Sequence, residues 1–315
     1  MYQFAHNFRQ VYPILNDPKK HGNQTDGPGT LYRSSRPDFM TESEVDKMKE
    51  MGIQSIVDLR SRSEYLKATG DKHLDRIYKP LKVLLPGFLG NKPSDAVKVK
   101  AFKTTACSSN ANTSTEQSRK HYFINFYNWN YIWTIFNRAT WYIKLYGILL
   151  LVIDVIFHTN YKHFIRLFAR NVLNVGGLLE QYIDMIEMSQ PSICAALKLL
   201  ATEGNLPAVI NCAHGKDRTG ILTALVLSCV GASREHIARD YALSEAELRP
   251  VHSRCHDEVV KKFHMSEQFL KSDVETMEGL LDYIDREYGS VQSYLECIGF
   301  GQVEQEKLKK NLDGM

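Results

Sequence analysis

The spacing of apolar and polar positions predicts alternating helices and strands in the first third of the chain. Thr41 and Glu44 form a capping-box pattern, which predicts a helix that ends near Gly52. Residues 53–61, IQSIVDLRS, are rich in β-branched side chains and predict a buried strand. Residues 31–39, LYRSSRPDF, are interpreted as a short turn-like segment. A strand that directly follows a helix is typical of an α/β layer.

The last third of the chain repeats this alternation. Residues 191–202 predict a helix, residues 206–211 (LPAVIN) a strand, and residues 219–230 a helix that is apolar nearly all round and stops at Gly231. A later helix has one apolar face and ends at Gly289, and the last helix starts near residue 302. No internal repeat is visible in the sequence.

The middle of the chain departs from this pattern. Residues 99–120 are mostly small and polar, which predicts a linker or surface insertion that interrupts a domain. Residues 121–175 are apolar and aromatic and predict a helical lid or insertion. Their longest uninterrupted apolar run, residues 145–153, is well short of the roughly 20 residues that cross a bilayer. Two alternatives stay open: a buried or lid helix, and peripheral membrane or partner contact through residues 131–170.

Composition restricts the class of protein. The 315 residues are 43% hydrophobic and 24% charged, which is typical of a soluble globular protein of one large or two smaller domains. The net charge of +3 arises from 39 basic and 36 acidic residues, so no bulk field attracts nucleic acid. Six cysteines without CxxC pairs, and a first segment without a signal-peptide core, predict a reducing, cytoplasmic compartment. The sequence predicts no oligomeric state.

Residues 211–220, NCAHGKDRTG, contain the densest group of chemically active side chains. Cys212 directly follows a predicted strand and Arg218 lies at the start of a predicted helix, so residues 213–217 form a tight loop at a helix N-terminus. Such a loop directs several backbone N–H groups into one small space, beside the positive end of the helix dipole. That space suits a tetrahedral oxyanion.

Each residue type in this loop has a physical reason to be there. Gly215 lets the backbone turn and approach a bound anion, and Gly220 permits close packing of the helix on the strand. The guanidinium of Arg218 can hold two phosphate oxygens, and Thr219 can donate to the sulfur or to the phosphate. The pKa of Cys212 is expected to fall from about 8.5 into the range of roughly 3.5 to 7.5.

The remaining loop residues are expected to line the anion site. Ala213 contributes backbone, and Lys216 and His214 add positive charge that favours a substrate with more than one phosphate. The alternative for Lys216 is an ion pair with Asp217 or with an exposed glutamate.

A thiolate at the bottom of a phosphate site is a nucleophile for phosphorus. The expected reaction is in-line attack on a phosphomonoester by Cys212, followed by hydrolysis of the cysteinyl-phosphate, without a metal or another cofactor. Two alternatives stay open. One is a pseudophosphatase that binds phosphate without turnover, and the other is sulfur or arsenate chemistry at the same thiolate.

The loop resembles the signature of the cysteine-dependent protein tyrosine phosphatases. Its Gly-Lys-Asp-Arg-Thr-Gly form is similar to a bacterial and fungal branch typified by a secreted mycobacterial phosphatase. The other segments that resemble this branch are NFRQV (7–11), LYRSSRP (31–37), GIQSIVDLRSRSE (52–64), ALVLSCVGASREHIARDYALS (224–244) and IDREYGSVQSYLECIGF (284–300). The resemblance does not inform residues 90–160.

The resemblance implies a fold, a substrate class and partners. The fold is an α/β domain with a central, mostly parallel sheet flanked by helices and a helical lid inserted before the loop. Residues 1–315 would form this single phosphatase domain. The implied partners are phosphotyrosine proteins, sometimes phosphoserine substrates or phosphoinositides.

The sequence also departs from the family pattern. The family usually has histidine before the nucleophilic cysteine, whereas this chain has Asn211, which predicts lower activity. Residues 77–90, where relatives carry the general acid, contain no carboxylate, and the first one that follows is Asp95. Asp217 is therefore the candidate acid, and its alternative role is a salt bridge or a hydrogen bond that braces the loop. Asp58 and Arg60 match a strand-end pair of this branch and are interpreted as scaffolding for the loop.

Overall fold

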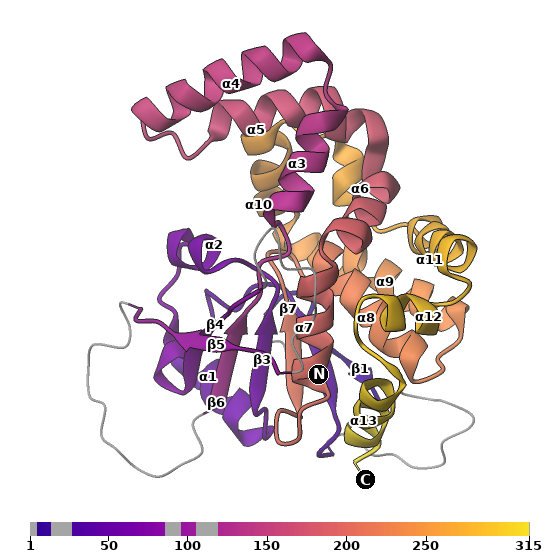
Figure 1. Ribbon diagram of the computed structural model, residues 1–315. Helices are drawn as coiled ribbons and strands as arrows, with labels where there is room; N and C mark the ends of the chain where they lie inside the picture. The colour runs from indigo at the N-terminus through magenta and orange to yellow at the C-terminus, as the bar shows by residue number, and fades with distance from the viewer. Residues whose placement is uncertain (1–4, 14–26, 86–95, 105–118, 315) are drawn as a thin grey trace.

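The computed structural model describes residues 5–13, 27–85, 96–104 and 119–314. Its strands form a seven-stranded sheet in the order β1-β2-β7-β3-β6-β4-β5 (Figure 1). The strands are β1 (Arg9–Tyr12), β2 (Leu31–Ser34), β3 (Ser55–Asp58), β4 (Tyr78–Val83), β5 (Val99–Ala101), β6 (Arg119–Phe123) and β7 (Ala208–Asn211). The two edge pairs, β1–β2 and β4–β5, are antiparallel and the other neighbours are parallel. The predicted α/β fold with a mostly parallel sheet is confirmed.

Helices cover both faces of the sheet and extend beyond one end of it. Those before strand β7 are α1 (Glu42–Glu50), α2 (Arg62–Lys67), α3 (Trp129–Arg138), α4 (Trp141–Ile156), α5 (Lys162–Phe168), α6 (Asn174–Met188) and α7 (Gln190–Leu200). Those after it are α8 (Asp217–Cys229), α9 (Arg234–Leu248), α10 (His252–His256), α11 (Val274–Tyr288), α12 (Val291–Cys297) and α13 (Gln302–Asp313). Short turns of other helix types are η1 (His73–Arg76), η3 (Ala169–Leu173), η4 (Arg249–Val251), η5 (Asp257–Lys261) and η6 (Glu267–Leu270).

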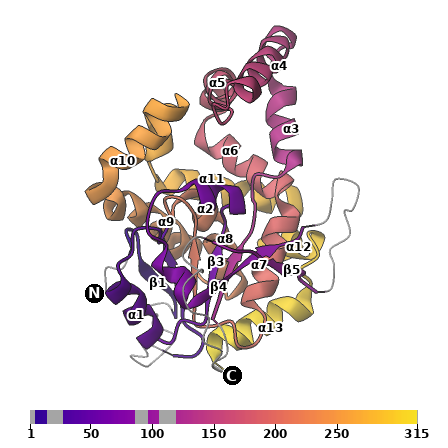
Figure 2. The same cartoon turned by 90° about the vertical axis from the view of Figure 1, so that its left-hand side faces the viewer.

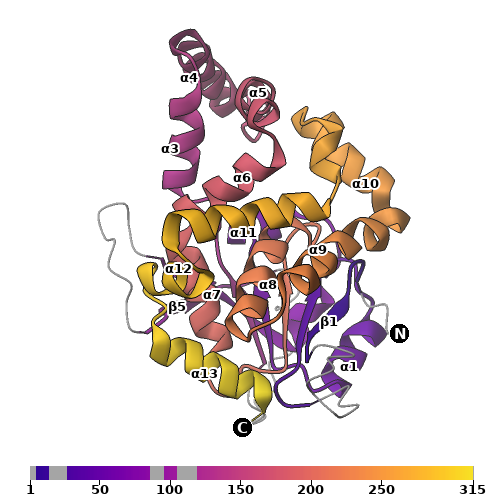
Figure 3. The ribbon, with the colours of Figure 1, turned by 90° about the vertical axis from the view of Figure 1, so that its right-hand side faces the viewer.

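The two faces of the sheet bury two different hydrophobic clusters. Because side chains alternate along a strand, Ile56 and Val209 pack with α1 and η1 on one face, while Val57 and Ile210 pack on the other. The second cluster is the larger one and includes α7, α8, α11 and α12. Figure 3 shows α8, α9 and α11 on this side of the sheet. The sheet is thus a rigid base for the loops at its ends.

Strand register brings the loops that follow β2, β7, β3 and β6 together. Asn211 pairs in register with Ser34 on one side and Asp58 on the other, and Asp58 in turn pairs with Phe123. The carboxyl ends of four parallel strands therefore meet at one edge, where open α/β sheets bind ligands. The segment that follows β7 lies in the middle of this edge.

Three sequence-based boundaries are wrong. Residues 31–34, interpreted as turn-like, form the fully buried strand β2. The segment 121–175, predicted as a helical lid, begins with the last residues of the buried strand β6, and its helices start only at Trp129. The predicted polar insertion, 99–120, starts with strand β5 and ends with the first residues of β6, while residues 105–118 lie outside the described residues.

The helices α3, α4 and α5 form a lid that projects beyond the carboxyl edge of the sheet (Figures 1 and 2). A Cβ on Gly147 of α4 would lie 2.7 Å from the Phe168 ring, so this glycine allows α4 and α5 to pack closely. Within the described part of the chain, no helix is both long and apolar enough to cross a membrane.

Candidate active site

The segment 212–216 connects β7 to α8 and forms a tight loop. Gly215 has φ +68°, and a Cβ at this position would lie 2.2 Å from the carbonyl oxygen of Ser34. Only glycine therefore fits between the loop and β2. Asp217 is the first residue of α8 rather than part of the loop. A Cβ on Gly220 would lie 2.9 Å from the ring of Tyr241, so this glycine admits α9 rather than a strand.

The carbonyl groups of this loop are held from outside. The Asn7 side-chain amide donates to the carbonyl oxygens of His214 (3.2 Å) and Gly215 (2.9 Å). Arg33 Nη2 also donates to the Gly215 oxygen, at 2.7 Å. The backbone N–H of Arg36 donates to the carbonyl oxygen of Ala213 at 3.2 Å. The carbonyl dipoles at 213–215 are therefore directed to the surrounding body of the protein.

The backbone N–H groups of the same loop, unlike its carbonyl groups, are not held by the surrounding protein. Among the described residues, the backbone N–H groups of residues 213–216 have no hydrogen-bond acceptor. A buried backbone donor without an acceptor is costly, so it marks a place where a ligand or water completes the bonding. These donors belong to consecutive residues just before a helix, which is the arrangement that binds oxyanions.

Cys212 lies at the base of this loop and is 2% exposed. Burial by itself raises the pKa of a thiol, and the carboxylate of Asp217 acts in the same direction. The positive charge of Arg218, together with the nearby hydroxyl and backbone N–H of Thr219, outweighs both effects. The pKa of Cys212 therefore lies below its usual value of 9.0. The fraction of reactive thiolate rises accordingly.

The guanidinium of Arg218 is held in place by three groups. Its Nη1 donates to the carbonyl oxygen of Leu59 at 3.0 Å and to Glu64 Oε1 and Oε2 at 3.1 and 3.2 Å. Its central carbon lies 4.6 Å from the ring centroid of Tyr127. Leu59 follows β3, Glu64 is in α2 and Tyr127 follows β6, so three chain segments fix one cation beside Cys212.

Lys216 and Asp217 form an ion pair in which the lysine is buried and the aspartate is partly exposed. Lys216 Nζ lies 2.7 Å from Asp217 Oδ1 and donates to the carbonyl oxygen of Lys271 at 2.8 Å. The hydroxyl of Tyr182 donates to Asp217 Oδ1 at 2.7 Å. Burial raises the pKa of Asp217, but Lys216 and Tyr182 lower it by a larger amount. The pKa of Asp217 is therefore below its usual value of 3.8. The alternative role for Lys216, pairing with Asp217, is the one that the structure has.

His214 points away from the loop, toward α10 and η5. Its Nε2 lies 2.9 Å from Glu258 Oε2, and Arg36 Nη2 lies 2.6 Å from Glu258 Oε1. Burial lowers the pKa of His214, but hydrogen bonds with Cys255 and Glu258 raise it to about 9. The expected third cation is present, and its ring is bound to a carboxylate.

Asp58 and Arg60 are fully inside the protein and face each other. Arg60 Nη2 lies 2.7 Å from Asp58 Oδ2, and Arg60 Nη1 lies 2.6 Å from Asp38 Oδ2. His121 Nε2 of β6 lies 3.3 Å from the same Asp58 carboxylate. These ion pairs fix the turn that presents the Leu59 carbonyl to Arg218. The arrangement is that of a scaffold next to the site.

The chain matches the sequence model of the "Tyrosine phosphatase family" over residues 2–158 and 170–313. This match covers nearly all of the chain and includes the loop with its cysteine and arginine. The chain belongs to this tyrosine phosphatase family.

Two curated phosphatases are similar to this family member. A tyrosine-protein phosphatase of Nostoc commune is 26% identical over 147 residues, which are 43% of this chain and 49% of the relative. The triple specificity protein phosphatase PtpB of Mycobacterium tuberculosis is 29% identical over 122 residues, 34% of this chain and 44% of the relative. The chain thus spans less than half the length of each of these relatives.

Asn211, which replaces the expected histidine of the phosphatase family, is completely buried at the end of β7. Neither its amide nitrogen nor its amide oxygen has a hydrogen-bond partner among the described residues. A buried amide without partners contributes nothing that orders the loop. In this family member the loop is instead ordered from outside, by Asn7, Arg33 and Arg36.

Several residues around the phosphatase loop were not predicted as site residues. They share one feature, which is contact through tertiary structure with a residue of the loop or of the first turn of α8; they are Asn7, Arg33, Glu64, Tyr127 and Tyr182. For Glu64 a signal was present, because Ser61 and Glu64 form a second capping-box pattern directly after the DLRS segment. Asn7 and Arg33 lie inside segments that resemble the family. Asp95, the first carboxylate after residues 77–90, lies outside the described residues.

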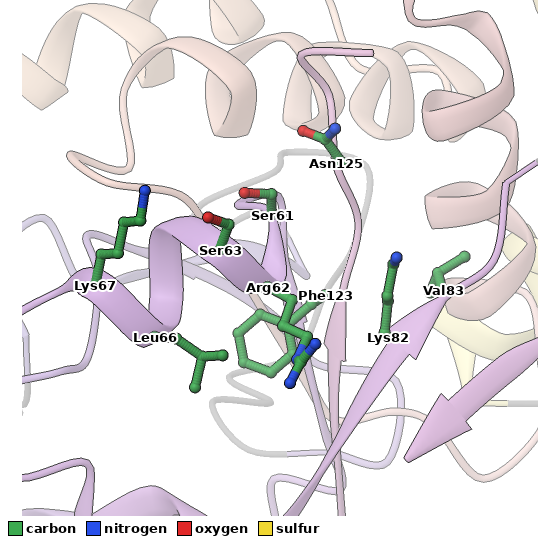
Figure 4. A pocket seen from close by; sticks show the side chains of 9 residues that line it. All are labelled: Ser61, Arg62, Ser63, Leu66, Lys67, Lys82, Val83, Phe123 and Asn125. Atoms are coloured by element: carbon green, nitrogen blue, oxygen red, sulfur yellow. The ribbon is translucent and has the colours of Figure 1, made fainter. Parts of the chain in front are cut away.

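A basic pocket of about 410 Å³ adjoins α2 (Figure 4). Its walls include Arg62 and Lys67 of α2 and Lys82 of β4, and no carboxylate is among the lining residues that the structure describes. The remaining lining residues are Ser61, Ser63, Leu66, Val83, Phe123 and Asn125. This pocket and the surroundings of Arg218 share helix α2, because Glu64 of that helix contacts Arg218. It supplies positive charge that Lys216 and His214 do not.

Within the described segments, no group of three or more His, Cys, Asp or Glu residues could hold a metal ion.

Proposed function

We propose that this protein hydrolyses phosphomonoesters through a cysteinyl-phosphate intermediate. The observation that carries the proposal is the loop itself, in which unpartnered N–H groups at 213–216 directly follow a buried thiol of lowered pKa. The proposal treats residues 1–315 as one phosphatase domain.

In the first step the Cys212 thiolate attacks phosphorus, and an S–P bond forms as the ester P–O bond breaks. The loop N–H groups and the guanidinium of Arg218 stabilise the equatorial oxygens. Asp217 gives its proton to the leaving oxygen. In the second step water attacks the phosphocysteine, Asp217 takes a proton from that water, and inorganic phosphate leaves with the thiolate restored.

The acid role of Asp217 has a consequence for substrate choice. Lys216 and Tyr182 favour the ionised form of Asp217, so little of it is protonated near neutral pH. Esters of phenols need less help from an acid than esters of aliphatic alcohols, because phenolate is the better leaving group. Phosphotyrosine proteins are therefore the proposed main substrates, ahead of phosphoserine.

Phosphoinositides are the second proposed substrate class. The basic pocket at Arg62, Lys67 and Lys82 can accept a further phosphate of a substrate bound at Cys212. The printed name of the similar mycobacterial enzyme, a triple specificity phosphatase, agrees with more than one substrate class. A phosphoinositide lies in a membrane surface, which a peripheral contact through residues 131–170 would bring within reach.

The test is turnover of p-nitrophenyl phosphate by purified protein. The proposal predicts vanadate-sensitive release of phosphate that is lost in Cys212→Ser, with Cys297→Ser, at an exposed cysteine, as the matched control. Asp217→Asn should slow phosphoserine peptides more than phosphotyrosine peptides, by roughly 10²-fold or more against a smaller loss. Tight binding of phosphopeptide without any turnover would instead indicate a pseudophosphatase.

A further inference from the structure

The lid carries an apolar face with no partner in the described chain. Only Gly147 and Asp154 of α4 are buried. Ten large apolar side chains of α4 and its C-cap are each between 49% and 72% exposed. They are Trp141, Tyr142, Leu145, Tyr146, Ile148, Leu149, Val152, Val155, Ile156 and Phe157. Figures 1 and 2 show α4 as the helix farthest from the sheet. A continuous apolar face of this kind marks a binding surface.

The three tryptophans of the chain all lie in this lid and are all exposed. Trp129 and Trp133 of α3 are 73% and 54% exposed, and Trp141 of α4 is 72% exposed. Tryptophan is on average one of the more buried residues in a soluble protein. Its ring has an apolar body and one polar N–H, so its preferred exposed position is the boundary between water and lipid.

The charge of the lid is strongly positive. Residues 129–173, from α3 to η3, contain five Lys or Arg and a single acidic residue, whereas the complete chain has a net charge of only +3. That acidic residue, Asp154, is 1% exposed and accepts hydrogen bonds from His163 and the Phe164 N–H. One of the five cations, Arg138, is paired with Glu180 and Asp184 of α6. Lys162 and Arg170 are exposed. The lid thus combines an uncharged apolar face with cations and presents no exposed carboxylate.

The lid is tied to the body, and its inner side is already occupied. Lys67 Nζ of α2 donates to Asn160 Oδ1 at 2.8 Å, and Arg166 Nε donates to the carbonyl oxygen of Lys262 at 2.8 Å. Phe168 of α5 packs against Phe136 of α3, with ring centroids 5.6 Å apart. The outer face of α4 therefore cannot turn onto the catalytic loop unless these contacts break.

We propose that the outer face of α4 docks in the plane of an anionic lipid bilayer. In this arrangement Trp141 of α4 enters the headgroup boundary, and the cations of the lid, among them Lys162 and Arg170, attract anionic headgroups. A helix that is amphipathic and too short to span lies along the surface. A second copy of this chain is a poorer occupant, because two lids with the same positive charge repel each other. The inference goes beyond the proposed function and does not require turnover at Cys212.

Tryptophan emission and vesicle flotation test this docking with the full-length protein. Vesicles of phosphatidylcholine with phosphatidylserine should carry the protein and shift its emission to shorter wavelength, since every tryptophan is in the lid. Vesicles of phosphatidylcholine alone should bind at least about tenfold more weakly, because each cation near an anionic surface contributes roughly 1 kcal/mol. High salt should remove most of this preference.

Two pairs of matched variants separate the apolar and the charged contributions. Leu145→Gln with Leu149→Gln should weaken anionic vesicle binding by at least about tenfold. The control, Leu243→Gln with Val303→Gln, changes similarly exposed residues on α9 and α13 and should bind like the wild type. Lys162→Gln with Arg170→Gln should lose the anionic preference, whereas Lys307→Gln with Lys310→Gln on α13 should keep it.

Cys212→Ser should bind vesicles as the wild type does, so a failure of the catalytic proposal leaves this test unaffected. The docking proposal is wrong if the wild type ignores anionic vesicles, or if both apolar pairs lose binding equally. It is also wrong if light scattering finds a dimer that Leu145→Gln with Leu149→Gln dissociates, without vesicle binding. That result would assign the face to a second copy of the chain.

Discussion

At the scale of single residues, the candidate site is a balance of burial against local charge. Cys212 is buried deeply enough to disfavour a thiolate, yet Arg218 and Thr219 reverse that effect and lower its pKa. Arg218 can lie beside the sulfur because Glu64 neutralises part of its charge. The charge of Lys216, in contrast, is already paired with the carboxylate of Asp217.

Gly215 tests the loop geometry without a change of charge. Gly215→Ala adds a Cβ that would lie 2.2 Å from the Ser34 carbonyl oxygen at φ +68°. Gly231→Ala is the matched control, because Gly231 has φ +82° but nothing within 4 Å of an added Cβ. We expect the control to lose about 1 kcal/mol in urea unfolding. Gly215→Ala should lose clearly more and should abolish turnover, and equal losses would contradict the steric argument.

The ion pair of His214 with Glu258 predicts a pH dependence of stability. The pKa of His214 is raised from 6.5 to about 9 in the folded protein, so its contribution is complete below pH 6.5 and disappears as pH rises through 9. The pKa of Glu258 is lowered from 4.5 to about 2, so its contribution is present above pH 4.5 and is lost toward pH 2. The pair therefore stabilises the protein most between pH 4.5 and 6.5.

His214→Gln should accordingly lose about 1–3 kcal/mol of unfolding free energy near pH 6, and much less of it above pH 9. Urea unfolding of both proteins in a Cys212→Ser background measures this, because that background removes a second titrating group. The exposed His252, changed to Gln, is the control. A loss that is the same at both pH values would mean that His214 contributes by packing alone.

At the scale of elements, local sequence signals predicted the helix ends that local interactions determine. The capping box at Thr41 fixes the start of α1, and Gly231 and Gly289 end α8 and α11 as their positive φ allows. Strand β6 was not predicted, because its sequence RKHYF begins with three basic residues and continues directly into the aromatic segment of the lid. Its pairing with β3 and β4 is a long-range property. Lys216 pairs with its neighbour Asp217, which the sequence offered as one alternative. Its second partner, the Lys271 carbonyl, and the His214 partner Glu258 are long-range and could not be predicted from local sequence.

Helix α2 combines capping with support of the site in one residue. Glu64 completes the capping box with Ser61 and also accepts from Arg218. Glu64→Gln keeps a capping side chain but removes the charge, whereas Glu64→Ala removes both. Both variants should lower kcat/KM for p-nitrophenyl phosphate by about 10- to 100-fold, because Arg218 loses its position. Glu64→Ala alone should also cost about 0.5–2 kcal/mol of stability.

The second capping box of the chain is a control for this prediction. Glu44 completes the box of Thr41 at the start of α1. Glu44→Gln and Glu44→Ala should reproduce the two stability effects while kcat/KM stays unchanged. If Glu64→Gln were as active as the wild type, Glu64 would be a capping residue without influence on Arg218.

At the scale of the whole molecule, the protein consists of a well-packed sheet body and a lid that is packed on one side. In α8 every residue except Asp217 and Ser228 is buried, and the helix contacts α6, α7, α9 and α12. In α4 only two residues are buried, and α5 is its main neighbour. Local stability follows the number of buried apolar contacts, so the two helices should open at different free energies.

Hydrogen–deuterium exchange of the free protein tests this difference. The backbone N–H groups in the middle of α4 should exchange at least about tenfold faster than those of α8, because α4 opens without disturbing the sheet. Phe168→Ala should accelerate exchange in α4 and α5, since its ring fills the space left by Gly147, and should leave α8 unchanged. Leu308→Ala, at a buried residue of α13 on the opposite end of the body, is the matched large-to-small control. Equal protection of α4 and α8 in the wild type would mean that lid and body unfold as one unit.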